Sequence, residues 1–91
     1  MRVDSFLKQS RLVKRRALAK ELCEDGAVKL NGKPVRASHE IAPGDRLVLR
    51  LWNRSIEIEV DKLPGRGLSA TEARLLYRIV AEQRVEESEE S

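Results

Sequence analysis

Apolar residues recur at helical spacing through the first quarter of the chain. Residues 3–9 predict a short helix capped by Asp4, and residues 10–25 predict a second, stronger helix. Gly26 suits the end of the second helix because glycine adopts the left-handed conformation without strain. The residues predicted to be buried on these two helices are Phe6, Leu7, Leu18, Ala19, Leu22 and Cys23.

The spacing of apolar residues changes to two after Gly26, which is typical of strands. Residues 27–30 alternate and are followed by Asn31-Gly32, a strong signal for a tight turn. Residues 33–36 predict a short returning strand, which Pro34 restricts to the edge of a sheet.

Residues 46–60 predict a second hairpin. With Asn53-Arg54 as a two-residue loop, apolar residues and opposite charges both fall into register. The predicted pairs are Leu51 with Ile56, Leu49 with Ile58, Leu47 with Val60, Arg50 with Glu57, and Arg46 with Asp61.

The last third of the chain predicts a connector, a helix and a tail. Residues 63–67 are rich in proline and glycine, and Ser69-Ala70-Thr71-Glu72 matches a helix capping box. A helix over 70–84 is therefore expected, and residues 86–91 form an acidic tail with nothing to bury. The predicted fold class is α+β, with two N-terminal helices packed on a small antiparallel sheet plus a C-terminal helix.

Charge is distributed unevenly along these elements. Residues 1–54 carry 13 basic and 6 acidic residues, whereas residues 55–91 carry 5 basic and 9 acidic ones. The net charge of +3 for the 91 residues is therefore the sum of a basic N-terminal part and an acidic C-terminal part. Such asymmetry indicates a surface that binds a polyanion.

Several classes of protein are excluded by what the chain lacks. A single cysteine and a single histidine leave no disulfide and no cysteine- or histidine-based metal site, and we expect no cofactor. No apolar run could span a bilayer and no secretory signal is present, so a cytoplasmic protein is expected. Cys23 is interpreted as a buried structural thiol, and without a catalytic constellation the chain is predicted not to be an enzyme.

The candidate binding residues are cations on the two predicted helices. Cations at a helix N-terminus oppose the helix dipole, so their presence there favours anion binding, above all of phosphate. The basic set consists of Arg2, Lys8, Arg11, Lys14, Arg15, Arg16 and Lys20.

Three other residues have alternative interpretations. The Asn31-Gly32 turn is either an ordinary hairpin or a device that brings Lys33, or Lys29, beside the basic set. Trp52 is either a packing residue or a platform for base stacking, and packing is favoured because a single aromatic makes a poor platform. Asp4 is a helix cap that could also orient an arginine.

Four sequence blocks resemble the small RNA-binding domain first described in ribosomal small-subunit protein S-four. They are Arg2-Val3-Asp4-Ser5-Phe6-Leu7, Arg15-Arg16-Ala17-Leu18-Ala19-Lys20-Glu21-Leu22, Gly26-Ala27-Val28-Lys29-Leu30-Asn31-Gly32-Lys33 and Pro43-Gly44-Asp45. Residues 72–77 resemble the terminal helix of the stand-alone members, which are heat-shock protein fifteen and the shorter RqcP-type proteins. The chain lacks the long basic extension of heat-shock protein fifteen, and its length resembles the RqcP type.

The resemblance implies an S-four-like αL RNA-binding domain over 1–62, a connector and helix over 63–85, and the acidic tail. It also implies that Asp4 supports an RNA surface formed by Arg2, Arg11, Lys14, Arg15, Arg16 and Lys20.

The function implied is non-enzymatic RNA binding in bacterial ribosome-associated quality control of stalled nascent chains. The implied partners are ribosomal RNA of the large subunit, peptidyl-tRNA and a tailing factor of that pathway, bound by a monomer. Two alternatives remain, a DNA-binding module and an interaction adaptor acting through the acidic C-terminal helix. The second helix carries few base-reading residues such as Asn or Gln, which disfavours DNA.

Overall fold

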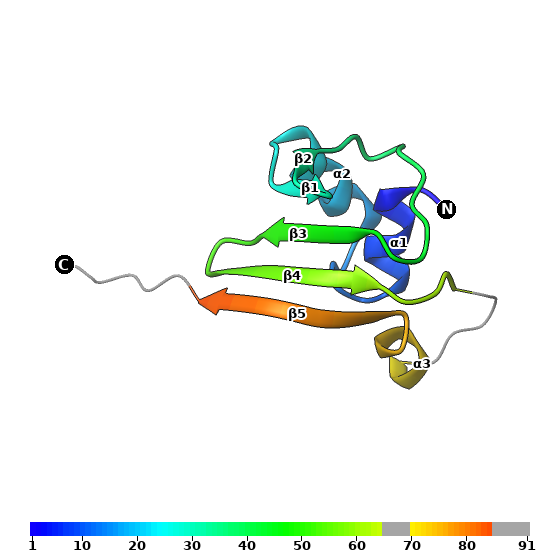
Figure 1. The fold of residues 1–91 in the computed structure, drawn as a ribbon. Coiled ribbons are helices and arrows are strands. Elements are labelled where there is room, and N and C mark those ends of the chain that lie inside the picture. The colour runs from blue at the N-terminus through cyan, green and yellow to red at the C-terminus, as the bar shows by residue number, and fades with distance from the viewer. Residues whose placement is uncertain (65–69, 85–91) are drawn as a thin grey trace.

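Two short helices pack on a five-stranded antiparallel sheet in the computed structural model, which describes residues 1–64 and 70–84 (Figure 1). The helices are α1 (Val3–Gln9) and α2 (Arg16–Glu24), and a third, α3 (Ala70–Arg74), precedes the last strand. The strand order across the sheet is β2-β1-β3-β4-β5. The strands are β1 (Val28–Leu30), β2 (Lys33–Pro34), β3 (Arg46–Arg50), β4 (Arg54–Val60) and β5 (Tyr77–Arg84).

The core lies between the helices and one face of the sheet. Phe6 and Leu7 of α1 are fully buried, as expected, and alternate residues of β3 and β4 are buried opposite them. The predicted α+β class and the two N-terminal helices are therefore confirmed. The buried residues contributed by the sheet are Val28, Leu47, Leu49, Ile56, Ile58 and Val60.

The Asn31-Gly32 turn joins β1 to β2, as predicted. Both residues have positive φ, 50° and 90°, which is the conformation that the tightest hairpin turns require. The returning strand is shorter than expected and spans only Lys33–Pro34. The amide of Val35 still donates to the carbonyl of Val28 at 3.3 Å, and the Val35 side chain packs in the core.

The second helix is shorter than predicted. It begins at Arg16 rather than near residue 10, because Arg11 adopts a left-handed conformation with φ of 64° and ends the preceding turn. Val13 then turns into the core and donates a backbone hydrogen bond to Leu7. Lys14 therefore lies in the connecting loop and not on the helix.

The β3–β4 hairpin has a different register from the predicted one. Trp52 and Asn53 form the turn, and the amide of Leu51 donates to the carbonyl of Arg54 over 2.8 Å. Every pair is therefore shifted by two residues, which keeps the same side chains on the buried face. The observed pairs include Leu49 with Ile56, Leu47 with Ile58, Arg50 with Ser55 and Arg46 with Glu59.

The expected helix over 70–84 is wrong beyond its first turn. The helix ends at Arg74, and Tyr77–Arg84 form β5, which pairs with β4 along its whole length (Figure 1). A helix would have left the acidic strand β4 as a sheet edge, whereas β5 satisfies its backbone groups. Arg78 also reaches Glu59 and Asp61, each at 3.2 Å. The acidic C-terminal helix required by the adaptor alternative is therefore absent from the described residues.

Two further expectations concern segments that lie partly or wholly outside the described residues. The connector over 63–67 is described only at Leu63 and Pro64, and the acidic tail over 86–91 lies outside the described residues. The division of the chain at residue 62 stays a prediction, although β4 and β5 on its two sides belong to one sheet. Within the described residues, none of the helices has the length and apolar character needed to cross a membrane.

Candidate nucleic-acid interface

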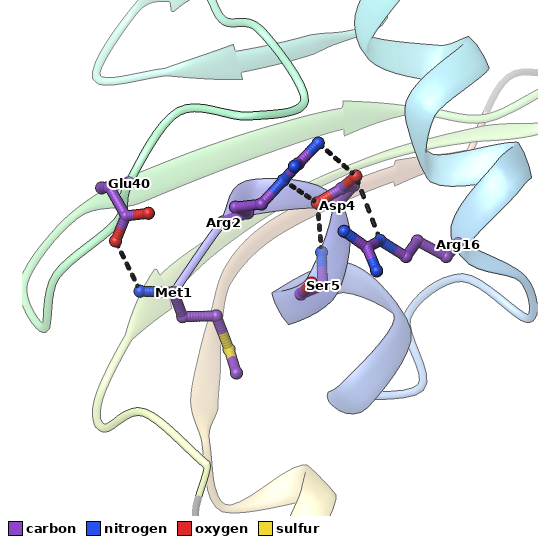
Figure 2. Close-up of polar contacts among 6 residues, drawn as sticks. All are labelled: Met1, Arg2, Asp4, Ser5, Arg16 and Glu40. Atoms are coloured by element: carbon purple, nitrogen blue, oxygen red, sulfur yellow. Dashed lines mark hydrogen bonds and ion pairs between the residues drawn. The ribbon is translucent and has the colours of Figure 1, made fainter.

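The buried carboxylate of Asp4 holds together the start of both helices. Its side chain is 2% exposed and accepts hydrogen bonds from Arg2 Nε and Nη2, each at 3.2 Å (Figure 2). Arg16 Nε donates to the same carboxylate at 3.3 Å, and the backbone amide of Ser5 at 2.7 Å. Asp4 thus orients two arginines that lie fourteen positions apart in the chain. The prediction that Asp4 caps α1 is wrong, because Arg2 occupies the N-cap position without a side-chain cap and Asp4 lies in the first turn.

These contacts determine the charge of Asp4. Burial by itself raises the pKa of this carboxyl, but the hydrogen bonds from Arg16, Ser5 and Arg2 and the charge of Arg16 together hold it below its ordinary value of 3.8. Asp4 is therefore ionised at neutral pH. Each guanidinium remains substantially exposed, at 43% for Arg2 and 56% for Arg16, so its other N–H groups face solvent.

Arg2 and Arg16 line a shallow hollow together with Lys20. The hollow has a volume of about 300 Å³ and is also bordered by Asp4 and Ala17. Arg16 and Lys20 share this face because they are four residues apart on α2. Three cations surrounding a single carboxylate leave an excess of positive charge that suits a phosphate.

Three more cations surround a second hollow, at the loop between the helices. Lys8, Arg11 and Lys14 line it, with Gln9 and Val13, around a volume of about 270 Å³. No carboxylate of the described residues forms an ion pair with these three cations, so their charges are available to an incoming anion. Six of the seven predicted cations are thus divided between two hollows, and Arg15 lines neither of them.

Arg15 is the residue directly before the first turn of α2. In the chain it lies between cations that line the two hollows. No side chain caps this helix, and its first turn contains no acidic residue. The helix N-terminus therefore presents unpaired amides beside Arg15 and Arg16. This observation agrees with the sequence-based argument that cations are placed here against the helix dipole.

Arg11 occupies a conformation that favours glycine. A side chain at φ of 64° costs about 1–2 kcal/mol relative to the right-handed region, and a glycine there removes that cost. The Arg11 side chain is exposed and forms no ion pair with the described residues, so its charge is available to an anion in spite of this backbone cost.

We expect the Arg11→Gly variant to be at least as stable as the parent, and more stable than Arg11→Ala by about 1 kcal/mol. Both variants should bind RNA more weakly, by a similar factor, because each removes the same cation. Urea denaturation and salt-dependent RNA binding of the two variants check this. Full RNA affinity in either variant would remove Arg11 from the interface.

Lys33 is not brought into either hollow. It is exposed on β2, at the edge of the sheet, and lines none of the surfaces that contain the helical cations. Sequence reasoning instead missed Arg36, which shares a larger hollow of about 490 Å³ with Arg2 and Lys20. The signal was weak, because Arg36 follows a two-residue strand and belongs to no charge cluster in the sequence.

The single cysteine is buried, whereas the single histidine is exposed. Cys23 is buried on α2, and burial, followed by the charges of Asp4 and Glu24, raises the pKa of its thiol to about 11. A thiol with this pKa is a poor nucleophile at neutral pH, which confirms its interpretation as structural. No group of three metal-ligating side chains occurs within residues 1–64 and 70–84, and His39 is exposed.

Comparisons with known proteins agree with this geometry. The S4 domain model matches residues 1–47. The RQC P-site tRNA stabilizing factor of Bacillus subtilis is 39% identical over 96% of this chain and 100% of its own length. The factor of the same name from Halalkalibacterium halodurans is 39% identical over 98% of this chain and 100% of its own length.

A solved structure extends the similarity to the fold. Heat Shock Protein 15 of Vibrio cholerae superposes with a TM-score of 0.82 at 32% identity, covering 89% of this chain and 82% of that one. That relative was solved as a trimer, so the expectation of a monomer for this chain is not supported. From the domain match and the near full-length identity, the chain belongs to the S4 domain family and, within it, to the non-enzymatic RQC P-site tRNA stabilizing factors.

Proposed function

We propose that this chain binds ribosomal RNA of the large subunit and the peptidyl-tRNA held there, in quality control of stalled nascent chains. The proposal sets this activity in the bacterial cytoplasm and includes a tailing factor of the same pathway as a functional partner. It is supported by the relatives that are named RQC P-site tRNA stabilizing factors and that align over their full length.

The observation that carries the proposal is the Asp4 cluster with its two half-exposed arginines. A buried carboxylate fixes the side chains of Arg2 and Arg16 before any ligand arrives, while leaving N–H groups of each directed to solvent. Preorganised guanidinium groups match phosphate oxygens in a two-pronged geometry and lose little entropy on binding. A rigid pair of this kind suits a fixed phosphate spacing, as in folded RNA.

The mode of recognition follows from the shape of RNA helices. Their major groove is too deep and narrow for side chains to read, so proteins recognise phosphates, 2′-hydroxyls and overall shape. The interface is made of cations and contains few base-reading amides, which suits that mode and disfavours a sequence-specific DNA reader.

Sedimentation of the tagged protein from a bacterial lysate tests the proposal. We expect it to migrate with free large subunits at low salt and to dissociate steeply as salt rises. The seven cations Arg2, Lys8, Arg11, Lys14, Arg15, Arg16 and Lys20 predict a slope of about −5 to −6 in a plot of log affinity against log salt.

Two outcomes would contradict the proposal. Exclusive migration with small subunits would remove the large-subunit partner, and tighter binding to duplex DNA than to large-subunit RNA at equal salt would favour the DNA-binding alternative. Binding that does not change with salt would contradict a phosphate interface of any kind.

A further inference from the structure

Trp52 projects from the β3–β4 turn almost fully exposed, which the preferred sequence interpretation as a packing residue did not anticipate. Its exposed fraction is 84%, whereas Phe6 is completely buried. Most of the indole therefore gains no stabilisation from burial. A single exposed apolar side chain is common on protein surfaces, so the surroundings of Trp52 decide whether it marks a binding surface.

The indole lies over a groove that joins the turn to the helices. The groove has a volume of about 320 Å³, and Leu18 of α2 and Leu51 contribute to its apolar lining. Leu18 is 43% exposed, although the sequence places it on the buried face of α2. Trp52 is therefore one wall of a preformed apolar surface and not an isolated aromatic.

The rim of this groove is positively charged. Lys14, Arg54 and Arg84 line it, and no acidic residue does. Arg54 is paired with Glu82 at 3.0 Å, whereas Lys14 and Arg84 form no ion pair within the described residues. The groove therefore combines an apolar, aromatic lining with a cationic rim. This combination matches a nucleotide, whose base is flat and whose phosphate is negative.

Lys14 connects this groove to the phosphate-binding surface. It lines both the groove beneath Trp52 and the hollow that contains Lys8 and Arg11. An RNA strand whose phosphates lie along the second hollow therefore passes directly beside the indole. This continuity favours RNA over an acidic protein segment as the occupant.

We propose that the groove beneath Trp52 binds an unpaired nucleobase of the RNA, stacked on the indole, with the adjoining phosphates held by Lys14 and Arg84. The inference rests on the proposed function and adds a specific subsite to it. Single-stranded bases stacked on aromatic side chains are the usual means by which proteins read unpaired RNA. The groove thus selects loops, bulges or ends over continuous duplex.

The chain contains one tryptophan, so its fluorescence reports this subsite alone. We expect a single-stranded RNA oligonucleotide to quench Trp52 and to protect it from acrylamide. An abasic oligonucleotide of the same length should compete for the cationic surface, with the same dependence on salt, but leave the fluorescence unchanged. A fully paired RNA duplex should bind without quenching.

Variants separate stacking from charge. Trp52→Ala should weaken single-stranded RNA binding by about 5- to 100-fold, while Trp52→Phe retains most of the affinity. Leu75→Ala removes another exposed apolar side chain, one that does not line this groove, so it is the matched control and should bind as the parent does.

Failure of the inference differs from failure of the proposed function. If RNA binds with steep salt dependence but Trp52→Ala binds as tightly as the parent and the fluorescence is unchanged, the stacking site is wrong and the RNA surface stands. Equal quenching by abasic RNA, or by an acidic peptide that displaces RNA, would also overturn the stacking site. If no RNA binds at any salt concentration, both proposals fall.

Discussion

Asp4→Ala is expected to weaken binding to the large subunit, although it removes a negative charge and so raises the net charge of the protein by one unit. The carboxylate lies against Arg2 and Arg16 and holds both guanidinium groups in place. Without it, each side chain regains its rotamer freedom, and that entropy is lost again on binding. We expect a loss of affinity of about tenfold or more, measured by sedimentation or filter binding at fixed salt.

A control variant distinguishes positioning from charge. Asp25→Ala removes an exposed carboxylate just after α2 and should leave the affinity unchanged or slightly higher. If Asp4→Ala tightens binding as Asp25→Ala does, the buried carboxylate plays no part in arranging the arginines.

The same substitution should reduce stability in a pH-dependent way. At neutral pH we expect a loss of about 1–3 kcal/mol in the free energy of unfolding, because the buried hydrogen bonds to Arg2, Ser5 and Arg16 disappear. The pKa of Asp4 is below its ordinary value of 3.8 in the folded protein. The stabilisation is therefore fully present above about pH 3.8 and is lost as the pH falls through the folded pKa.

Urea titrations of the parent and Asp4→Ala, at pH 7 and at decreasing acidic pH, measure this difference. Other carboxylates protonate in the same range, so the difference between the two proteins is the informative quantity. It should shrink toward zero at low pH. A difference that stays constant would show that the loss comes from packing and not from the ionised carboxylate.

Arg16→Ala is the second substitution with a large expected effect. Arg16 is 56% exposed, so its removal costs less than about 1 kcal/mol of stability. A charge-assisted contact to phosphate contributes about 1.5–3 kcal/mol, so affinity should fall by about 10- to 100-fold. The slope of log affinity against log salt should decrease by about one unit.

Two further variants define what Arg16 contributes. Arg16→Lys keeps the charge but loses the planar fork, so it should restore the salt slope and only part of the affinity. Arg74→Ala removes an exposed arginine from α3 and should bind as the parent does. Parental binding by Arg16→Ala across a salt titration would show that the Asp4 cluster is not the RNA surface.

The sequence could predict which residue types form the candidate site, but not how they are arranged in space. The cations between Arg2 and Lys20 could be recognised because they accumulate in one segment and oppose a helix dipole. Their arrangement could not, because Arg11 ends the turn that follows α1 and Lys14 lies in the loop before α2. Trp52 was expected to pack against the rest of the protein. It is exposed because it lies in the hairpin turn.

Local periodicity determined the α+β class, the first helix, the Asn31-Gly32 turn and the strands of the second hairpin. These features depend on residues close in sequence, where side-chain spacing and turn chemistry act directly. The inward face of the hairpin also followed from the sequence, since a shift of two residues leaves it unchanged.

Tertiary structure decided the exact register, the start of α2 and the fate of the C-terminal segment. A capping box at 69–72 predicts a helix over 70–84, yet residues 77–84 form β5 because β4 offers unpaired backbone groups and acidic partners for Arg78. Likewise, only the fold brings Asp4 between Arg2 and Arg16. Contacts between distant segments outweigh local propensities of a few tenths of a kcal/mol per residue, and the sequence pattern of one segment cannot encode them alone.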